Sequence, residues 1–159
     1  PVVIVATAYR RADVAHSLAG FGFLVPKRER RRVLGTLFSS SMFAGRAPEG
    51  AVLLTTFAGG RRNPEVAALG DDAVVDAVTG EHRELLGASA PPLWSAVTRW
   101  PQAIPQYDLG HLDRVLPAAE AETEWPGLAF CANWRGGVSV SDCVKNGHAT
   151  AERLHALLG

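Results

Sequence analysis

The residues best suited to chemistry lie between Gly136 and Asp142, where a glycine pair precedes an amphipathic run. Gly136 and Gly137 allow the backbone to turn tightly and to approach a ligand closely. Ser139 and Asp142 stand three residues apart, which is the spacing of a capping box at the start of a helix. Free N–H groups and the positive end of the helix dipole would there bind an electronegative group. An ordinary strand-to-helix connection would explain the same pattern without a ligand.

Two elements must position this turn. The short apolar run Leu128–Ala132, which follows the turn pair Pro126-Gly127, predicts a buried strand. After the turn, apolar or small residues recur in steps of four and three, which predicts a helix with one face turned to a core. These residues are Val140, Val144, Gly147, Ala151, Leu154 and Leu158.

The composition of the chain limits its class. Of 159 residues, 47% are hydrophobic and 20% are charged, which suits one globular domain. The 16 basic and 16 acidic residues cancel, so no net charge attracts nucleic acid. Cys131 and Cys143 lack a second pair or clustered histidines, so we expect no metal site and interpret both as buried thiols of an intracellular, cytoplasmic protein. No apolar run approaches the roughly 18–20 residues of a membrane span, and the start at Pro1 within an apolar run suggests a piece of a longer protein.

The first part of the chain predicts four strands joined by short polar turns, which implies a largely antiparallel sheet. Val2–Ala8 is rich in β-branched residues, and we expect it to be covered on both faces. Phe21–Val25 and Val33–Ser40 flank the basic segment Lys27–Arg32, which indicates a hairpin with a solvated, charged tip rather than a phosphate site. The fourth strand covers Ala51–Phe57.

The middle of the chain adds helices and one more strand. Asp71-Asp72 can cap a helix, with Gly87 in the usual place after its last turn. The apolar positions of this helix fit a 3.6-residue period and are Val74, Val78, Leu85 and Leu86. Leu93–Trp100 predicts a strand, Trp100–Tyr107 an irregular segment because of its two prolines, and Leu109–Ala121 a helix. The predicted fold class is therefore α+β, with a mostly antiparallel mixed sheet of about five to six strands and two to three helices.

Four segments follow one another in the order and spacing of the C-terminal part of protoporphyrinogen oxidases, which belong to the flavin amine oxidase superfamily. These segments are Gly20–Pro26, Leu34–Ser40, Ile104–His111 and Asn133–Gly147. The chain resembles this family from Pro1 to about Leu157, which implies FAD-dependent oxidation of a porphyrinogen to a porphyrin in haem synthesis. The family's N-terminal Gly-x-Gly-x-x-Gly fingerprint does not occur in this sequence. The chain thus resembles the last third of a two-domain flavoprotein and, alone, is expected to be inactive.

The resemblance also implies domains, a cofactor and partners. Residues 1–127 would belong to the substrate-binding domain, and residues 128–159 would supply the final strand and helix of the FAD-binding domain, without its N-terminal dinucleotide-binding unit. The implied cofactor of the full-length enzyme is FAD, and the implied partners are a tetrapyrrole substrate and O₂ or another electron acceptor. The resemblance leaves open peripheral membrane association and a homodimer of the full-length enzyme.

Seven positions match residues near the flavin in the family: Trp100, Asn133, Gly136, Gly137, Val138, Ser139 and Val140. The backbone of the last three would meet the pyrimidine edge of the isoalloxazine, and the two glycines would let the backbone pass close to the ring. Ala132 stands where the family usually has glycine before Asn133, which puts the tightness of that turn in doubt.

Leu24, Leu37 and Phe57 match positions that line the porphyrinogen cleft in the plant-type enzymes. Alternation along strands puts Leu24 and Leu37 on the two strands of one hairpin, and Phe57 could share their face on the next strand. Plain core packing is the alternative for all three. No residue is assigned a catalytic role, because nothing in the sequence gives proton chemistry to His111 or to another histidine.

Two further functions stay open. The resemblance also implies, through bacterial relatives, oxidation of coproporphyrinogen, and the sequence does not distinguish the two tetrapyrroles. A stable α+β binding module without catalysis would be a function of a different class.

Overall fold

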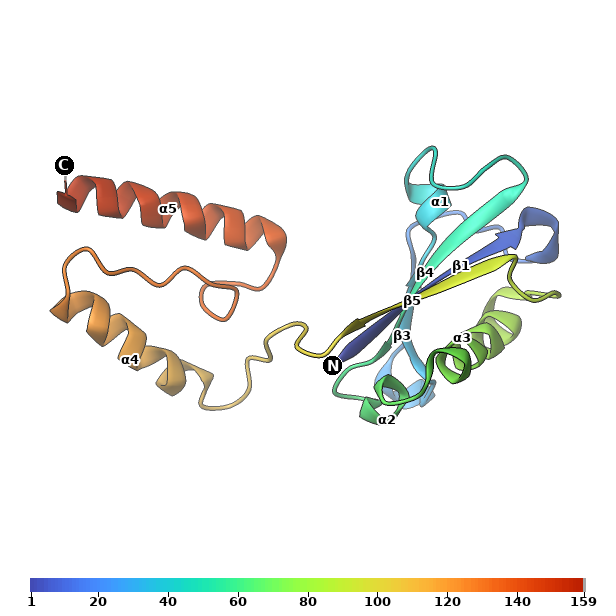
Figure 1. The fold of residues 1–159 in the computed structure, drawn as a ribbon, viewed down its shortest axis with the longest axis horizontal. Helices are drawn as coiled ribbons and strands as arrows, with labels where there is room; N and C mark the ends of the chain where they lie inside the picture. Colours follow the sequence, from blue (N-terminus) through green and yellow to red (C-terminus); the bar gives the residue numbers. More distant parts are fainter. Residues whose placement is uncertain (159) are drawn as a thin grey trace. The chain divides into compact units, whose positions relative to one another are not determined.

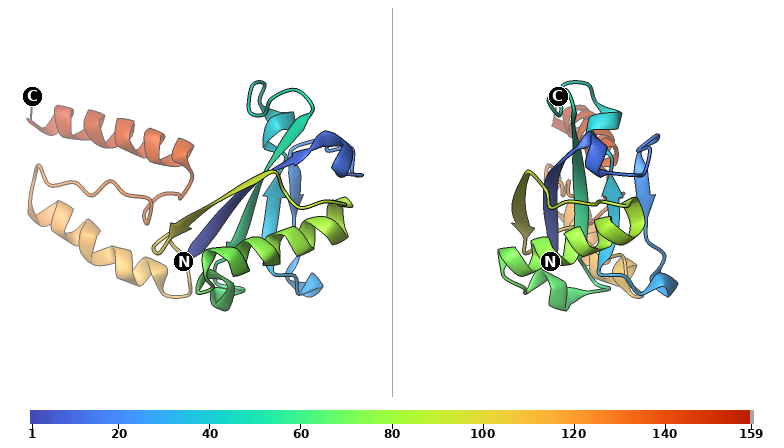
Figure 2. Two further views of the ribbon diagram at one scale, coloured as in Figure 1. Left: turned by 45° about the vertical axis from the view of Figure 1, so that its right-hand side comes forward. Right: turned by 90° about the vertical axis from the view of Figure 1, so that its right-hand side faces the viewer.

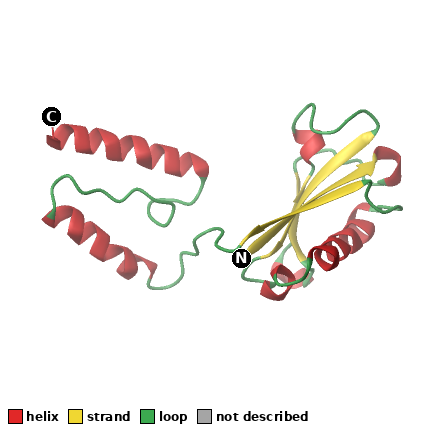
Figure 3. Cartoon of the chain, viewed as in Figure 1, coloured by secondary structure: helices red, strands yellow, loops and turns green. Residues whose placement is uncertain are grey.

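The structure, a computed structural model, describes residues 1–158. The chain forms two compact units, one of residues 1–103 and one of the described residues from 104 onward. The first unit holds all the strands, and the second holds two long helices joined by an irregular segment (Figures 1 and 3). The predicted α+β class is confirmed.

The first unit is built on a five-stranded antiparallel sheet with the strand order β2-β3-β4-β1-β5. The strands are β1 Val2–Arg10, β2 Gly22–Leu24, β3 Val33–Leu37, β4 Ala51–Gly59 and β5 Trp94–Trp100. Three helices belong to this unit: α1 Ser39–Met42, α2 Pro64–Ala67 and α3 Asp71–Leu86. Short 3-10 turns occupy Arg11–Asp13 and Lys27–Glu29.

The third strand is shorter than its sequence pattern predicts. The structure ends β3 at Leu37, and Ser39 and Ser40 begin helix α1 instead of extending the strand. The Ser39 and Ser40 hydroxyls contact β4, through the Thr55 hydroxyl at 2.8 Å and the Leu53 N–H at 3.0 Å respectively. These serine contacts let the chain leave the sheet without losing its attachment to β4.

Helix α3 covers one face of the sheet (Figure 2). Val74 and Val78 of α3 form a buried cluster with Val3 and Val5 of β1. Alternate β1 residues are buried, while Val2, Ile4, Ala6 and Ala8 are only half-buried within this unit. The prediction that Val2–Ala8 is covered on both faces is therefore wrong for this unit. Its apolar run is continuous, but one helix shields only one face of a strand whose side chains alternate.

A polar chain of hydrogen bonds lies inside the covered face. The buried imidazole of His82, on α3, lies 3.1 Å from the Tyr9 hydroxyl through Nδ1 and 2.8 Å from the Thr56 hydroxyl through Nε2. The Thr56 hydroxyl in turn lies 3.0 Å from that of Thr36. Burial lowers the pKa of His82 to about 4, so the ring is neutral at pH 7.

The second unit contains α4 His111–Glu124 and α5 Val140–Leu158. The start of α5 is where the capping-box spacing predicts it. The apolar face of this helix is not turned to a core within the unit, however, because Val140 is 81% exposed and Val144 is 64% exposed. Nothing among the described residues packs over that end of the face.

The predicted buried strand at Leu128–Ala132 is wrong. This segment is irregular, and Leu128 and Phe130 are more than a third exposed. A strand needs a neighbouring backbone to receive its N–H groups, whereas the Phe130 N–H donates to the carboxylate of Glu122 at 2.7 Å. Apolar sequence alone therefore did not produce a strand here.

Candidate functional site

The three residues predicted to line a substrate cleft share one face of the sheet. Leu24 of β2 pairs with Gly35 of β3, and Gly35 pairs with Phe57 of β4. Leu37 lies two residues after Gly35, so its side chain points to the same side. Pairing across three strands therefore brings Leu24, Leu37 and Phe57 onto one surface.

Trp100 lies on the same surface at the opposite edge of the sheet. It pairs with Val2 of β1, and Ile4, two residues further along β1, pairs with Phe57. We define the open face as the surface opposite α3 that carries Ile4, Leu24, Leu37, Leu53, Phe57 and Trp100. None of these six residues belongs to either buried cluster of the unit. Plain core packing therefore does not account for them within this unit.

The open face is apolar and accessible. Leu24 is 85% exposed and Trp100 is 51% exposed, while Leu37, Leu53 and Phe57 are half-buried by their neighbours. Gly35, between Leu24 and Phe57, has no side chain, and a Cβ built there would meet the Leu24 side chain at 3.0 Å. A flat apolar molecule could lie against such a surface without burying a charge.

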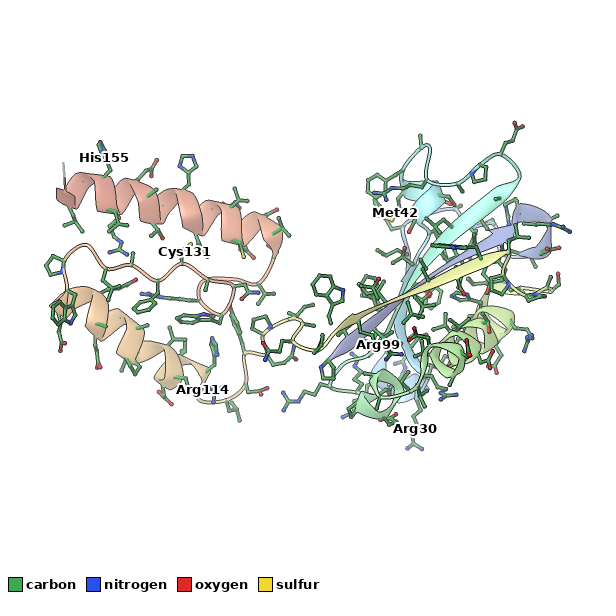
Figure 4. The ribbon with its side chains drawn as sticks, in the orientation of Figure 1. Arg30, Met42, Arg99, Arg114, Cys131 and His155 are labelled. Atoms are coloured by element: carbon green, nitrogen blue, oxygen red, sulfur yellow. The ribbon has the colours of Figure 1, made fainter. Side chains whose placement is uncertain are left out.

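Arg99 fixes the strand that carries Trp100. Its guanidinium points to the α3 side, where it donates to the carbonyls of Ala67 at 2.9 Å and Leu69 at 2.7 Å (Figure 4). It also contacts the carboxylate of Asp71, at the start of α3, at 2.6 Å. Because neighbouring residues in a strand face opposite sides, this contact holds Trp100 toward the open face.

The remaining predicted residues lie together in the second unit, on the turn of residues 133–137 and the start of α5. The Tyr107 hydroxyl donates to the Asn133 carbonyl at 2.9 Å and accepts the Gly137 N–H at 3.2 Å. The His111 ring stacks on that of Tyr107, with centroids 4.2 Å apart, and its Nε2 lies 2.7 Å from the Trp134 carbonyl. Asn133 thus contributes its backbone, while its own side chain is exposed.

Gly136 and Gly137 are required by the start of α5 itself. Both have positive φ, +83° and +128°. A Cβ on Gly136 would lie 2.7 Å from the amide nitrogen of Asn146, and one on Gly137 would lie 2.6 Å from the carboxyl carbon of Asp142. The glycine pair therefore allows two α5 side chains to fold back against the turn.

The capping box at Ser139 and Asp142 is formed. The Asp142 N–H donates to the Ser139 hydroxyl at 3.0 Å, and the Ser139 hydroxyl and N–H donate to the Asp142 carboxylate at 2.6 Å and 3.3 Å. These hydrogen bonds from Ser139 lower the pKa of Asp142. The Ser139 N–H is thereby engaged. Val138 and Val140 are exposed residues, and their N–H groups have no acceptor among the described residues. An electronegative group could accept hydrogen bonds from these two donors.

Sequence reasoning missed a charged cluster behind this turn. The Glu122 carboxylate of α4 accepts the Phe130 N–H and contacts Arg135 at 2.8 Å and Arg153 at 3.5 Å. The hydrogen bond from the Phe130 backbone, and then the nearby arginines, lower the pKa of Glu122. A cavity of about 300 Å³ lies beside this cluster, between α4, the 130–136 segment and α5. No local sequence pattern indicates that Glu122 forms this cluster, because its partners follow 8 to 31 residues later.

Cys131, on the segment between α4 and α5 (Figure 4), lines this cavity and is exposed. Cys143 is half-buried, so the prediction of two buried thiols is wrong. Cys131 lies on the segment that does not form the expected strand, and it therefore lacks the cover that a sheet would give. Among residues 1–158, no group of three or more His, Cys, Asp or Glu side chains could bind a metal ion. Within the same residues, no helix combines the length and the hydropathy that crossing a membrane requires.

Comparison with known proteins gives consistent matches over the chain. Residues 1–155 match the family described as flavin containing amine oxidoreductase. The mitochondrial protoporphyrinogen oxidase of Nicotiana tabacum is 41% identical over 163 residues, which cover 99% of this chain and 32% of that protein. The coproporphyrinogen III oxidase of Propionibacterium freudenreichii is 36% identical, covering 77% of this chain and 23% of that protein.

A solved structure agrees with the fold. A crystal structure of a candidate protoporphyrinogen oxidase from Exiguobacterium sp. 255-15 superposes with a TM-score of 0.78 at 23% identity, covering 98% of this chain and 34% of that one. At this identity the likeness supports the fold alone. The chain spans about a third of the length of these two relatives, the tobacco protein and the crystal structure.

Proposed function

This chain belongs to the family of flavin containing amine oxidoreductases, and from that premise we propose that it forms the C-terminal third of an FAD-dependent protoporphyrinogen oxidase. The parent enzyme would convert a porphyrinogen to a porphyrin in haem synthesis. The proposed cofactor of the parent enzyme is FAD rather than another flavin. This chain would contribute one wall of the substrate site and one edge of the flavin site.

The observation that carries the proposal is the apolar open face. A porphyrinogen is a large, mostly apolar macrocycle, and Leu24, Leu37 and Phe57 offer it a surface without charged side chains between them. Apolar contact of this kind contributes binding roughly in proportion to the area removed from water. We also assign Trp100, near one edge of the same face, to the flavin, because it matches a family position near that cofactor.

At the flavin, the chain's own contribution is placement and electrostatics. Flavin chemistry removes hydrogen from a substrate carbon, and the protein supplies binding and orientation. The N–H groups of Val138 and Val140 would donate to the pyrimidine edge, and Ser139 would maintain the helix start through Asp142. The dipole of α5 would favour negative charge at this edge.

The remaining assignments concern the full-length protein. Residues 1–127 would belong to the substrate-binding domain, and residues 128–159 to the FAD-binding domain. The electron acceptor would be O₂ or another oxidant. A cytoplasmic location, peripheral contact with a membrane and a homodimer all belong to this proposal.

Purified parent protein tests the proposal directly. Protoporphyrinogen would be added to the FAD-loaded protein, and the fluorescent porphyrin product would be followed over time. We expect turnover that depends on bound FAD and falls in a Leu24→Asp variant, because a carboxylate on the open face would have to be desolvated against the macrocycle. Absence of both flavin and turnover in the wild-type protein would refute the proposed function.

The second candidate is oxidation of coproporphyrinogen. The 36% identity to the Propionibacterium freudenreichii coproporphyrinogen III oxidase favours it. The two substrates differ in their peripheral carboxylates, so a ratio of kcat/KM values measured on the same protein separates them. A ratio above about ten in favour of one tetrapyrrole would decide the substrate, since tenfold corresponds to about 1.4 kcal/mol of transition-state binding.

A further inference from the structure

The turn of residues 133–137 is fixed from outside by an aromatic pair. The Tyr107 hydroxyl bonds to the backbone at both ends of the turn, at the Asn133 carbonyl and the Gly137 N–H. One phenol oxygen thereby acts as donor at one end and acceptor at the other. This arrangement sets the separation of the two ends.

His111 fixes the middle of the same turn. A carbonyl oxygen accepts only, so the 2.7 Å contact with Trp134 requires a hydrogen on Nε2 of His111. The His111 and Tyr107 rings are nearly parallel, with an angle of 11° between their planes. Stacking at a centroid distance of 4.2 Å limits the movement of each ring and so of both sets of hydrogen bonds.

Few other contacts hold this backbone. Among residues 1–158, the side chains that hydrogen-bond to the backbone of the turn are those of Tyr107, His111 and Asn146, the last by a 3.3 Å bond to the Arg135 carbonyl. Gly136 and Gly137 have no side chains with which to restrict the turn themselves. The path of the backbone into Val138 therefore depends on the aromatic pair together with the Asn146 bond and a backbone bond from the Arg135 N–H to the Ala132 carbonyl at 3.1 Å.

We propose that Tyr107 and His111 are positioning residues for the flavin, which orient the turn so that the N–H groups of Val138 and Val140 meet the pyrimidine edge. The inference rests on the proposed function, because it assumes that this edge binds there. In this proposal both rings act on the flavin only through the backbone of the turn. His111 acts as a fixed donor to a carbonyl and not as an acid or base for the substrate.

The test uses the full-length protein loaded with FAD. Tyr107→Phe keeps the stacked ring and removes both hydroxyl hydrogen bonds, so we expect the FAD dissociation constant to rise roughly three- to tenfold. The flavin reduction potential should also fall, by up to about 30 mV for a tenfold selective loss of the reduced form. The reduced flavin should be bound more weakly because misdirected N–H groups no longer stabilise the negative charge that the flavin gains on reduction.

His111→Gln supplies a second, independent variant. Glutamine keeps an N–H donor for the Trp134 carbonyl but loses the stacking, so we expect a smaller rise in the dissociation constant than for His111→Ala. Matched controls remove similar groups elsewhere in the same unit. Thr123→Val deletes a hydroxyl that bonds the Ala119 carbonyl at 3.1 Å, and His148→Gln changes an exposed histidine of α5.

The outcomes separate the inference from the proposed function. Wild-type affinity and potential in Tyr107→Phe would overturn the positioning role while leaving the proposed function intact. A loss of thermal stability with an unchanged potential would also overturn it, because the pair would then act on folding alone. A wild-type protein that binds no FAD would overturn both. Lowered affinity and potential in Tyr107→Phe, with both controls at wild-type values, would support the inference.

Discussion

Gly137 and Asp142 lie so close that a Cβ on the glycine would sit 2.6 Å from the carboxyl carbon of the aspartate. Asp142 occupies that space because it completes the capping box with Ser139. The backbone at Gly137 also has a φ of +128°, a conformation that residues with side chains rarely adopt. The side chains at the start of α5 therefore pack directly against the turn before it.

Gly137→Val should disrupt the packing of the turn against the start of α5. The valine would carry both the backbone strain and the clash, and we expect a loss of about 1–3 kcal/mol in the free energy of unfolding. FAD binding by the full-length protein should be lost with it. Urea unfolding followed by circular dichroism, and flavin absorbance after dialysis, measure the two effects. Normal folding with normal FAD binding would show that the flavin does not meet this helix start.

Gly147→Ala is the matched control in the same helix. A Cβ at Gly147 meets no atom within 4 Å. Alanine in a helix interior is more favourable than glycine by roughly 0.5–1 kcal/mol, so this variant should gain stability of that order. The two glycines of one unit should thus change the free energy of unfolding in opposite directions.

Phe57→Ala should separate a cleft residue from a core residue. In the full-length enzyme the lost contact with the macrocycle should cost ~1–3 kcal/mol of substrate binding and appear mainly as a raised KM, with kcat changed less. The cost in stability should be well below the roughly 3–5 kcal/mol of a packed core phenylalanine. Steady-state kinetics and thermal unfolding on the same variant measure both. A large loss of stability with an unaltered KM would contradict the cleft assignment of Leu24, Leu37 and Phe57 together.

Leu54→Ala gives the comparison on the other face of β4. Leu54 is fully buried in a core cluster. Its truncation should therefore cost about 2–5 kcal/mol of folding stability. KM should change little in protein that remains folded. Equal effects of Leu54→Ala and Phe57→Ala on stability would mean that the two faces are equally covered in the parent protein.

His82 should make the stability of the first unit depend on pH. Its pKa is about 4 in the folded state, against 6.5 as the ordinary value. Between these values the unfolded chain binds more protons, so stability is fully present above pH 6.5 and declines as the pH falls toward 4, by at most roughly 3 kcal/mol. Urea unfolding at pH 7.5 and pH 5 measures this slope. His82→Gln should flatten it, whereas a slope unchanged from wild type in that variant would assign the dependence to other groups.

Purified alone, this chain should retain no stoichiometric flavin. Within this sequence no Gly-x-Gly-x-x-Gly unit is present to bind the pyrophosphate, and the proposed contacts serve only one edge of the ring. Absorbance between about 350 and 500 nm after dialysis against buffer would detect bound FAD. A yellow preparation at one flavin per chain would contradict this expectation.

Local sequence determined the elements whose hydrogen bonds are local. The end of α3 followed from Gly87, and the start of α5 followed from Ser139 and Asp142. The predicted aspartate cap of α3 is wrong, because the helix begins after Gly70 without a side-chain cap and Asp71 contacts Arg99 instead. Helix bonds join residues four apart, so a short stretch of sequence contains all the groups that make them. Alternation along each strand is also local, but the shared face of Leu24, Leu37 and Phe57 depends on the pairing of β2, β3 and β4 as well.

Tertiary structure decided the features that depend on distant backbone. Whether β1 is covered on one face or on both depends on how many helices pack on the sheet. The residues of β1, Val2–Arg10, do not by themselves indicate that the strand pairs with Ala51–Gly59. Leu128–Ala132 has the composition of a strand but finds no neighbouring strand among the described residues. The bonds from Tyr107 to residues 26 and 30 positions later likewise appear only in the folded unit. Strand pairing, burial and side-chain bridges join groups far apart in the chain, and only folding brings those groups together.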